Sequence, residues 1–317
     1  MREAAAVALA ETGDAWKIAR RHRDPLALMV DPEVEAVAIC TPAADHVPLA
    51  LAALEAGRHV FVEKPLALAL AEADRLVASA DASAAKVLVG FNLRWPRLAL
   101  RAREIVRGGG IGRVRAVRSV FADPLLSQPG LPAWRLRRAQ GGGSLLDKGI
   151  HHFDLWRYLL GEEIETVTAA SDSATGDDEV ALVSARSSGG TLLSALVADA
   201  TGGGNEMTLY GDAGTLHLDF YRSDGLELRP PAELSGAPLT RLRRLAASLG
   251  ALARGAGELA RGGAFDAAYD RQWRHFADIV RRDLRSGCDA RDGREALAIA
   301  LAALADAPDR KEAPHGD

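Results

Sequence analysis

The sequence predicts an α/β domain followed by an α+β domain, in which an incomplete parallel N-terminal sheet precedes a large, mostly antiparallel open-faced sheet. Up to about residue 90, short apolar runs alternate with helical patterns, which is typical of βαβ crossovers and a parallel sheet. Beyond residue 110, strand-like runs follow one another across short turns, which favours antiparallel pairing. We therefore expect one domain over 1–90, a second over 91–307 and a polar tail over 308–317.

The first domain is predicted from runs bounded by turn residues. Thr41-Pro42 ends one strand-like run, and Gly57 ends the helix before the next. The strands are expected at Val34–Cys40, Val60–Val62 and Val87–Val89. The helices are expected at Ala4–Thr12, across Ile18–Arg23 and Pro25–Val30, and at Val47–Ala56 and Ala69–Ala80.

The second domain is expected to contain more strands than helices. Its strands are predicted at Val114–Phe121, Ile164–Ala170, Val180–Ala185, Thr191–Val197, Met207–Tyr210, Thr215–Phe220 and Leu226–Leu228. Its helices are predicted at Leu98–Val106, Ser144–Leu160, Arg271–Arg285 and Arg294–Ala307. Leu242, Leu245, Leu249 and Leu252 repeat at helical spacing among arginines, which favours a docked lid or a subunit contact over a membrane-surface helix.

Composition excludes several classes of function. A net charge of −4 and a pI near 6.1 give no electrostatic basis for nucleic-acid binding. Cys40 and Cys288 lie far apart, so neither a disulfide framework nor a metal site is expected, and Cys40 is predicted to be a small core residue. The longest apolar run, 296–305, is too short to span a membrane, and no signal peptide is visible. We expect a cytoplasmic protein.

Two motifs carry the chemistry. Glu63-Lys64-Pro65 follows the apolar run Val60–Val62, which places Lys64 at the carboxyl end of a strand, the edge where open α/β sheets build their sites. The alternative is a lysine on a surface loop.

The second motif is the run from Gly141 to His151, which places Asp147 and His151 four residues apart at the start of a helix. Residues i and i+4 share a helix face, and the polar stripe continues through Asp154 and Tyr158. Such a stripe on an apolar helix is costly to bury unless its members pair with one another or with a ligand. The alternative is a capped helix with a satisfied core histidine.

Together, these motifs resemble the Gfo/Idh/MocA family of nicotinamide-dependent oxidoreductases, relatives of glucose–fructose oxidoreductase and inositol dehydrogenase. The resemblance covers residue 4 to about 307 and implies a Rossmann-like first domain, NAD or NADP as the cofactor, and a sugar, polyol or related hydroxyl compound as the substrate. It implies that Lys64 and His151 handle the proton of the reacting hydroxyl, while Asp147 orients His151 or binds substrate.

The resemblance also implies binding residues. The cofactor contacts are expected from Thr41, Pro42, His46, Glu63, Lys64, Asn92 and Arg94. The substrate contacts are expected from Lys64, Trp134, Arg135, Asp147 and His151. Asn92 and Arg94 lie in the segment Gly90–Pro96, and they could instead hold the two domains together. Asp154 is expected to be structural.

The Gly-rich dinucleotide loop of the family is absent from this sequence, in which the only glycine before Gly57 is Gly13. The sequence therefore predicts that the first βαβ segment is missing, through a misplaced start, divergence or a different fold. Pyrophosphate recognition depends on donors in that loop, so NAD(P) is expected to bind weakly. The rival function is a non-catalytic sugar-binding or assembly protein derived from this family.

The strand Thr191–Val197 predicts self-association. Its residues are apolar on both alternating faces, and one layer of helices can cover only one face of a sheet. We expect a homodimer or tetramer formed through the C-terminal sheet.

Overall fold

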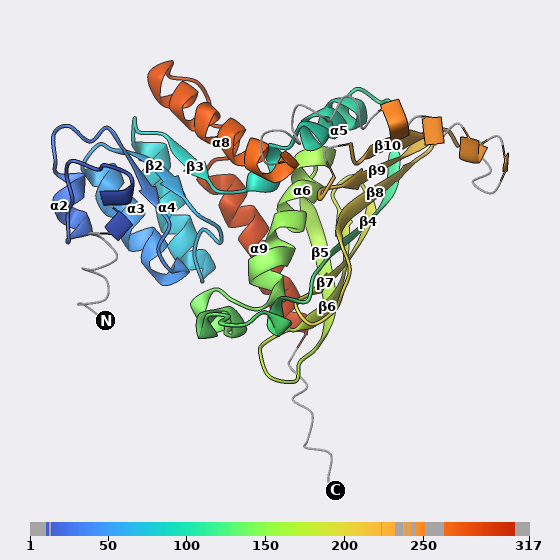
Figure 1. Ribbon diagram of the computed structural model, residues 1–317, viewed down its shortest axis with the longest axis horizontal. Coiled ribbons are helices and arrows are strands. Elements are labelled where there is room, and N and C mark those ends of the chain that lie inside the picture. Colours follow the sequence, from blue (N-terminus) through green and yellow to red (C-terminus); the bar gives the residue numbers. More distant parts are fainter. Residues whose placement is uncertain are drawn as a thin grey trace, which may run out of the picture.

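Two sheets of different kinds lie on either side of a layer of helices in the computed structural model (Figure 1). The structure describes residues 11–12, 14–222, 224–231, 237–238, 240–242, 245–246, 248–250 and 263–307. The predicted tail 308–317, most of the predicted helix Ala4–Thr12, and Leu252 lie outside these ranges. The other members of the leucine repeat, Leu242, Leu245 and Leu249, are exposed.

The first sheet is parallel, with the strand order β1-β2-β3. Its strands are β1 (Ala36–Ile39), β2 (His59–Val62) and β3 (Val87–Val89). The surrounding helices are α2 (Pro25–Met29), α3 (His46–Glu55) and α4 (Leu70–Ala82). Val60, Val62 and Leu88 are fully buried, which explains why these strands are continuous apolar runs rather than alternating ones.

The predicted helical stretch before β1 is wrong in its first half. Only Pro25–Met29 is helical, while 18–23 is irregular. Pro25 occupies the first turn, where its missing N–H costs nothing, and it disfavours helix in the residue before it. Asp24 caps this short helix, because its side chain accepts from the amide of Leu26 at 2.9 Å.

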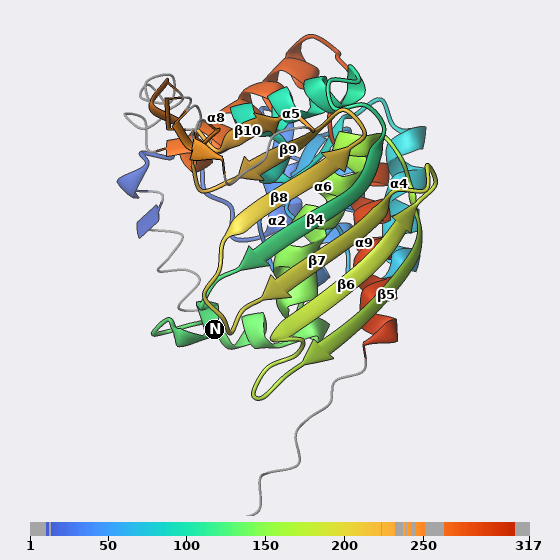
Figure 2. The same ribbon diagram turned by 90° about the vertical axis from the view of Figure 1, so that its right-hand side faces the viewer.

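The second sheet has seven strands in the order β10-β9-β8-β4-β7-β6-β5, and all neighbours are antiparallel except β4 and β7. The strands are β4 (Val114–Ala122), β5 (Ile164–Asp172), β6 (Val180–Ser187), β7 (Leu192–Ala198), β8 (Asn205–Gly211), β9 (Gly214–Asp219) and β10 (Leu226–Arg229). Figure 2 shows its open outer face, with the helices behind. This arrangement confirms the predicted fold class.

The helices of the second half link the two sheets. They are α5 (Arg97–Arg107), α6 (Ile150–Leu160), α8 (Gly263–Arg281) and α9 (Ala290–Asp306). The C-terminal segment also contacts the first sheet, because the amide of Val89 in β3 donates to the carbonyl of Cys288 at 2.9 Å. The division into 1–90 and 91–307 stays a prediction, and this contact shows that residues beyond 280 help to build the surroundings of the first sheet.

Candidate active site

A cavity of about 740 Å³ lies where the carboxyl ends of β1 and β2 meet the second half of the chain. This is the edge at which open α/β sheets bind ligands. Its lining includes predicted site residues from both halves of the chain: Thr41, Glu63, Lys64, Asn92, Trp134, Arg135, Asp147 and His151. Pro42 and His46 line a smaller cavity of about 210 Å³ that shares Thr41, Lys64 and Asp147 with it.

Lys64 bridges the two halves of the chain inside this cavity. Its Nζ donates to Oδ1 of Asp147 at 2.6 Å and to the carbonyl of the same residue at 2.7 Å. Arg135 Nη1 lies 3.4 Å from the other carboxylate oxygen. Burial by itself raises the pKa of Asp147, but Lys64 and then Arg135 offset burial, and the pKa lies below its usual value. Asp147 is therefore an anion held by two cations at neutral pH.

Asp147 and His151 are not hydrogen-bonded to each other, so Asp147 does not orient the imidazole through a hydrogen bond. The predicted continuous α-helix Ser144–Leu160 begins with a π-helical turn at Leu145–Gly149 and becomes α-helical at Ile150. Asp147 pairs with Lys64, and its influence on His151 is through charge.

His151 lies in an aromatic surrounding at the inner wall of the cavity. Its ring centroid is 5.9 Å from that of Phe91 and 6.3 Å from that of Phe121. Burial, and then the charge of Lys64, lower the pKa of His151 well below its usual value, although the charge of Asp147 acts in the opposite direction. Its Nδ1 is buried and has no hydrogen-bond partner among the described residues. The ring is therefore neutral at pH 7 and able to accept a proton.

The structure adds polar residues that the sequence did not indicate. Lys148 Nζ contacts Asp123 Oδ1 at 2.6 Å and Asp199 Oδ1 at 2.5 Å. Asn205 Oδ1 lies 2.9 Å from Nε2 of His152. The added lining residues include Phe121, Asp123, Lys148, Asn205, Phe220, Tyr221 and Tyr269. They come from separate strands, loops and helices, and only the position of Lys148 beside Asp147 could have drawn attention to one of them.

Thr41 and His46 have different surroundings. Thr41 lines both cavities, whereas the ring of His46 is 1% exposed and lies between two backbone carbonyls. His46 Nδ1 is 2.8 Å from the oxygen of Pro65, and Nε2 is 2.9 Å from that of Thr41. Both ring nitrogens are thus occupied by the protein, and His46 joins the two loops that frame the cavity instead of offering the cofactor a free nitrogen. Cys40 is exposed and lines the cavity, so its prediction as a core residue is wrong.

Glu63 and Asn92 form the wall beside β3. The carboxylate of Glu63 lies against Gly90, where an added Cβ would come within 2.8 Å of Oε2. Burial raises the pKa of Glu63, partly offset by the charge of Lys64. Oδ1 of Asn92 is buried and has no hydrogen-bond partner among the described residues. An unsatisfied acceptor in a cavity wall fits a ligand that carries an N–H or O–H donor.

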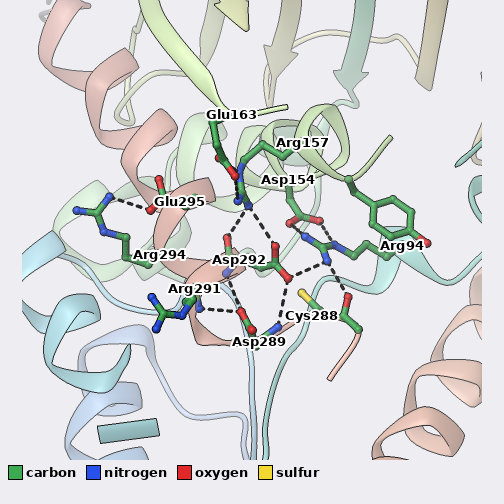
Figure 3. Close-up of polar contacts among 12 residues, drawn as sticks. Arg94, Asp154, Arg157, Glu163, Cys288, Asp289, Arg291, Asp292, Arg294 and Glu295 are labelled. Carbon is green, nitrogen blue, oxygen red and sulfur yellow. Dashed lines mark hydrogen bonds and ion pairs between the residues drawn. The ribbon is translucent and has the colours of Figure 1, made fainter. Parts of the chain in front are cut away.

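Arg94 is not a wall of this cavity. Its guanidinium donates to both carboxylate oxygens of Asp154, at 2.5 and 2.7 Å, and also contacts Asp292 at 3.0 Å and the carbonyl of Gly287 at 2.8 Å (Figure 3). Arg94 is 3% exposed and Asp154 0%. Of the two roles open to Arg94, the structure supports the one that holds the halves of the chain together. Asp154 is structural, as expected.

Comparison with protein-family models decides the family. The model described as an oxidoreductase family with an NAD-binding Rossmann fold matches residues 3–91, and the model of the GFO/IDH/MocA C-terminal domain matches residues 99–217. The chain belongs to the GFO/IDH/MocA family. The resemblance stated from the motifs is confirmed, and the matched first domain contains Thr41 and Lys64.

Relatives within the GFO/IDH/MocA family include inositol dehydrogenases. Myo-inositol 2-dehydrogenase of Thermotoga maritima is 36% identical over 172 residues, which are 54% of this chain and 49% of that protein. Inositol 2-dehydrogenase of Rhizobium meliloti is 32% identical over 215 residues, 63% of each chain. The matches therefore span about half to under two thirds of these relatives.

Solved structures of the family share the fold over most of the chain. A probable dehydrogenase from Thermotoga maritima has a TM-score of 0.75 at 26% identity, covering 94% of this chain and 86% of that one. Levoglucosan dehydrogenase in complex with NADH and levoglucosan has a TM-score of 0.76 at 20% identity, covering 94% and 84%. The second likeness concerns the fold alone.

The expected loss of the first βαβ segment is not borne out, because the NAD-binding family model matches from residue 3. The prediction rested on one loop motif, whereas the match extends across 89 residues (3 to 91). The weak cofactor binding and the non-catalytic alternative that followed from it have no support in the comparisons. Within the described residues, no helix is long and apolar enough to cross a membrane, and no group of His, Cys, Asp and Glu could hold a metal ion.

Proposed function

We propose that this protein is an NAD(P)-dependent oxidoreductase that acts on a CH–OH group of a sugar, polyol or related compound. The observation that carries the proposal is one cavity that holds a lysine ammonium paired with a carboxylate and a neutral, buried histidine, at the carboxyl ends of a parallel sheet. These are the groups that deprotonation of a hydroxyl requires: a cation beside the oxygen and a base for its proton.

His151 and Lys64 have separate tasks in this proposal. The neutral imidazole of His151 accepts the hydroxyl proton, and it returns that proton in the reverse direction. Lys64 donates a hydrogen bond to the oxygen as its negative charge develops, since its cation already lies in the cavity. Asp147 is a positioning residue, because its carboxylate fixes the direction of the Lys64 side chain.

The wall formed by Thr41, Glu63 and Asn92 fits a nicotinamide cofactor. Oδ1 of Asn92 is a buried acceptor without a partner, and Thr41 and Glu63 follow the carboxyl ends of neighbouring parallel strands. We expect Thr41, Pro42, Glu63 and Asn92 to hold the cofactor, whose bound nicotinamide supplies or accepts a hydride. The relatives solved with NADH have this fold, and the family model is that of an NAD-binding domain.

The opposite wall fits a molecule that carries several hydroxyl groups. Asp123, Lys148, Asn205 and Tyr221 offer acceptors and donors, while the rings of Phe121, Phe220 and Trp134 offer apolar faces for carbon-bound hydrogens. A sugar or cyclic polyol has both kinds of surface. The inositol dehydrogenases among the relatives act on a molecule of this class by name.

The test is a kinetic screen of the purified chain with both nicotinamides against inositols, aldoses and anhydrosugars. We expect turnover with at least one class, and a loss of about 10²–10⁴-fold in kcat/KM for His151→Ala. Trp16→Ala serves as the control, because Trp16 is 78% exposed and lies outside the cavity. Unchanged turnover in His151→Ala would refute the assigned base, and NADH that binds without any turnover across the screen would refute the substrate class.

We also propose that the chain forms a homodimer, or a tetramer built from such dimers, through the outer face of the seven-stranded sheet (Figure 2). Leu182 is 60% exposed, Leu192 51% and Tyr210 42% on this face. Serines and arginines lie between them, so the face is less apolar than the sequence predicted. Light scattering should report a multimer that Leu182→Asp/Leu192→Asp dissociates, while Leu284→Asp, at an exposed leucine beyond α8, has no effect. A monomeric wild type would contradict the proposal.

A further inference from the structure

A second cavity, of about 880 Å³, lies between α4, α5, the end of α6 and the start of α9. It shares no lining residue with the cavity that contains Lys64 and His151. Its lining is rich in arginine: Arg94, Arg103, Arg107, Arg157, Arg285, Arg291 and Arg294. Nothing in the proposed oxidoreductase chemistry uses these groups.

Four of these arginines pair with carboxylates, and Figure 3 shows the partners of Arg94 and Arg157. Arg94 pairs with Asp154 and Asp292, and Arg157 pairs with Glu163 at 2.6 Å. The remaining two pairs are Arg291 with Asp81 and Arg294 with Asp74. This part of the lining is therefore an ion-pair network that has no need of a ligand.

The other three arginines have no carboxylate partner among the described residues. Arg103 lies over the ring of Tyr158, 4.6 Å from its centroid, and Arg107 donates to the carbonyl of Tyr158 at 3.0 Å. Arg285 lies in the exposed connection between α8 and α9. The cavity thus carries three guanidinium groups that no described carboxylate contacts directly.

The position of Arg107 shows that these cations are crowded. Its guanidinium packs over Gly161, where an added Cβ would lie within 2.7 Å of it. Burial first, and then the charges of Arg103 and Arg94, lower the pKa of Arg107. Like charges held together in this way gain most from a bound anion.

The backbone amides of Arg291 and Asp292, at the start of α9, are not free to bind an anion in this cavity. The side chain of Asp289 accepts from the amides of Arg291 and Asp292 in a capping box, so these donors are already used. An anion in this cavity would therefore be bound by guanidinium groups.

We propose that this cavity binds a small phosphate-bearing molecule through Arg103, Arg107 and Arg285. Guanidinium groups donate paired hydrogen bonds to phosphate oxygens, and a tetrahedral anion can accept from several directions at once. Arg103 and Arg107 are four residues apart on α5, so they lie on one face of that helix, and Arg285 comes from a different segment. A volume of 880 Å³ leaves room for a phosphorylated metabolite larger than phosphate itself.

The test is a calorimetric titration of the full chain with inorganic pyrophosphate, at an ionic strength kept constant with sodium chloride. We expect saturable binding that weakens at least about tenfold in Arg103→Gln/Arg107→Gln, because charge-assisted hydrogen bonds are lost. Arg101→Gln is the matched control, since Arg101 lies on the same helix, pairs with Glu104 and is outside the cavity. Arg107→Lys should retain part of the affinity. Any binding of pyrophosphate at another site should be the same in the wild type and in all these variants, so it does not affect the comparison.

Crystals soaked in tungstate, a phosphate mimic with an anomalous signal, should show an ion beside Arg103 and Arg107. Equal pyrophosphate affinity in the double variant and the wild type would overturn the proposal. A heat of titration with pyrophosphate no greater than the heat of titration with sodium chloride alone would also overturn it. A double variant with a changed oligomeric mass and unchanged pyrophosphate affinity would also overturn it, and would assign the cavity to a subunit contact. None of these measurements uses turnover, so the result is independent of the proposed oxidoreductase activity.

Discussion

Two ion pairs begin in the same helical run but have different surroundings. Asp147, in the π turn, pairs with Lys64, and the two side chains are 11% and 16% exposed. Asp154, two turns later in α6, pairs with Arg94, and these side chains are 1% and 4% exposed. The first pair has one direct side-chain contact and borders a cavity, whereas the second is bidentate and enclosed.

The difference shows in the pKa of each acid. Burial alone raises the pKa of both, but in Asp147 the nearby cations prevail and the pKa is lowered, while in Asp154 burial prevails and the pKa is raised. A pair with access to the cavity can change partners when a ligand enters. A pair without such access is a fixed connection between elements, and its members cannot be separated without leaving a buried charge.

The largest expected effect concerns Lys64, which belongs to the ion pair that borders the cavity. Lys64→Met should lower kcat/KM by about 10²–10⁴-fold, because the cation beside the reacting oxygen is lost. Asp147 keeps Arg135 at 3.4 Å, so the melting temperature should change less than it does in Arg94→Met. Steady-state kinetics and thermal melts of the two variants provide the check. A stability loss as large as that of Arg94→Met would show that the Lys64 pair is structural as well.

The second prediction concerns the enclosed pair. Arg94→Met should destabilise the chain by about 3–5 kcal/mol in denaturant unfolding, because it leaves the carboxylate of Asp154 buried without a partner. The double variant Arg94→Met/Asp154→Leu should be more stable than the single one, since no uncompensated charge remains. If the double variant were the less stable of the two, the cost would come from lost packing instead.

The third prediction concerns pH and the buried histidines of α6. Burial lowers the pKa of His152 to about 4 from 6.5, and it lowers the pKa of His151 as well. The unfolded chain therefore takes up protons below pH 6.5 that the folded chain does not, and stability falls as the pH is lowered from 6.5 toward 4. For His152 alone, this loss reaches about 3 kcal/mol near pH 4.

The comparison that isolates this residue is His152→Gln, whose amide can still contact Asn205. Free energies of unfolding at several pH values between 4 and 6.5 should fall less steeply with decreasing pH in His152→Gln than in the wild type. Parallel curves would mean that His152 is protonated in the folded chain as readily as in the unfolded one.

The smallest expected effect concerns Gly90, which lies against Glu63 in the wall of the cavity. Gly90→Ala places a Cβ 2.8 Å from Oε2 of Glu63, and the flexible end of that side chain can move away. We expect a stability change below about 1 kcal/mol and a several-fold rise in the Kd for NADH, measured by fluorescence titration. Gly202→Ala is the control, because nothing lies within 4 Å of its added Cβ. An unchanged Kd in Gly90→Ala would remove Glu63 from the cofactor wall.

The strands and most helices could be predicted from sequence because burial imposes a local pattern. The continuous apolar runs Val60–Val62 and Val87–Val89 are buried strands of the parallel sheet, and both predictions are within one residue of the structure. The prediction of a helix at Ile18–Arg23 was wrong, because Pro25 and the capping residue Asp24 make the helix begin at Pro25. The start of α8 at Gly263 lies eight residues before the predicted start at Arg271.

The candidate site was predicted in part. Lys64, Asp147 and His151 stood out as polar residues in otherwise apolar segments, and the structure places all three in one cavity. The roles of Arg94 and His46 could not be settled, because each depends on partners that are distant in sequence. Asp154 is 60 residues from Arg94, and Pro65 is 19 residues from His46.

The sequence by itself determined the family, the two kinds of sheet and the identity of the central polar residues, because motif order and hydrophobic period are local properties. Only the tertiary structure decided which charges pair. Asp147 in the π turn at Leu145–Gly149 pairs with Lys64 instead of His151, and the packing of α5 against α6 gathers arginines that are scattered along the chain. Pairing depends on distances between elements, and those distances follow from how the elements pack around the two sheets.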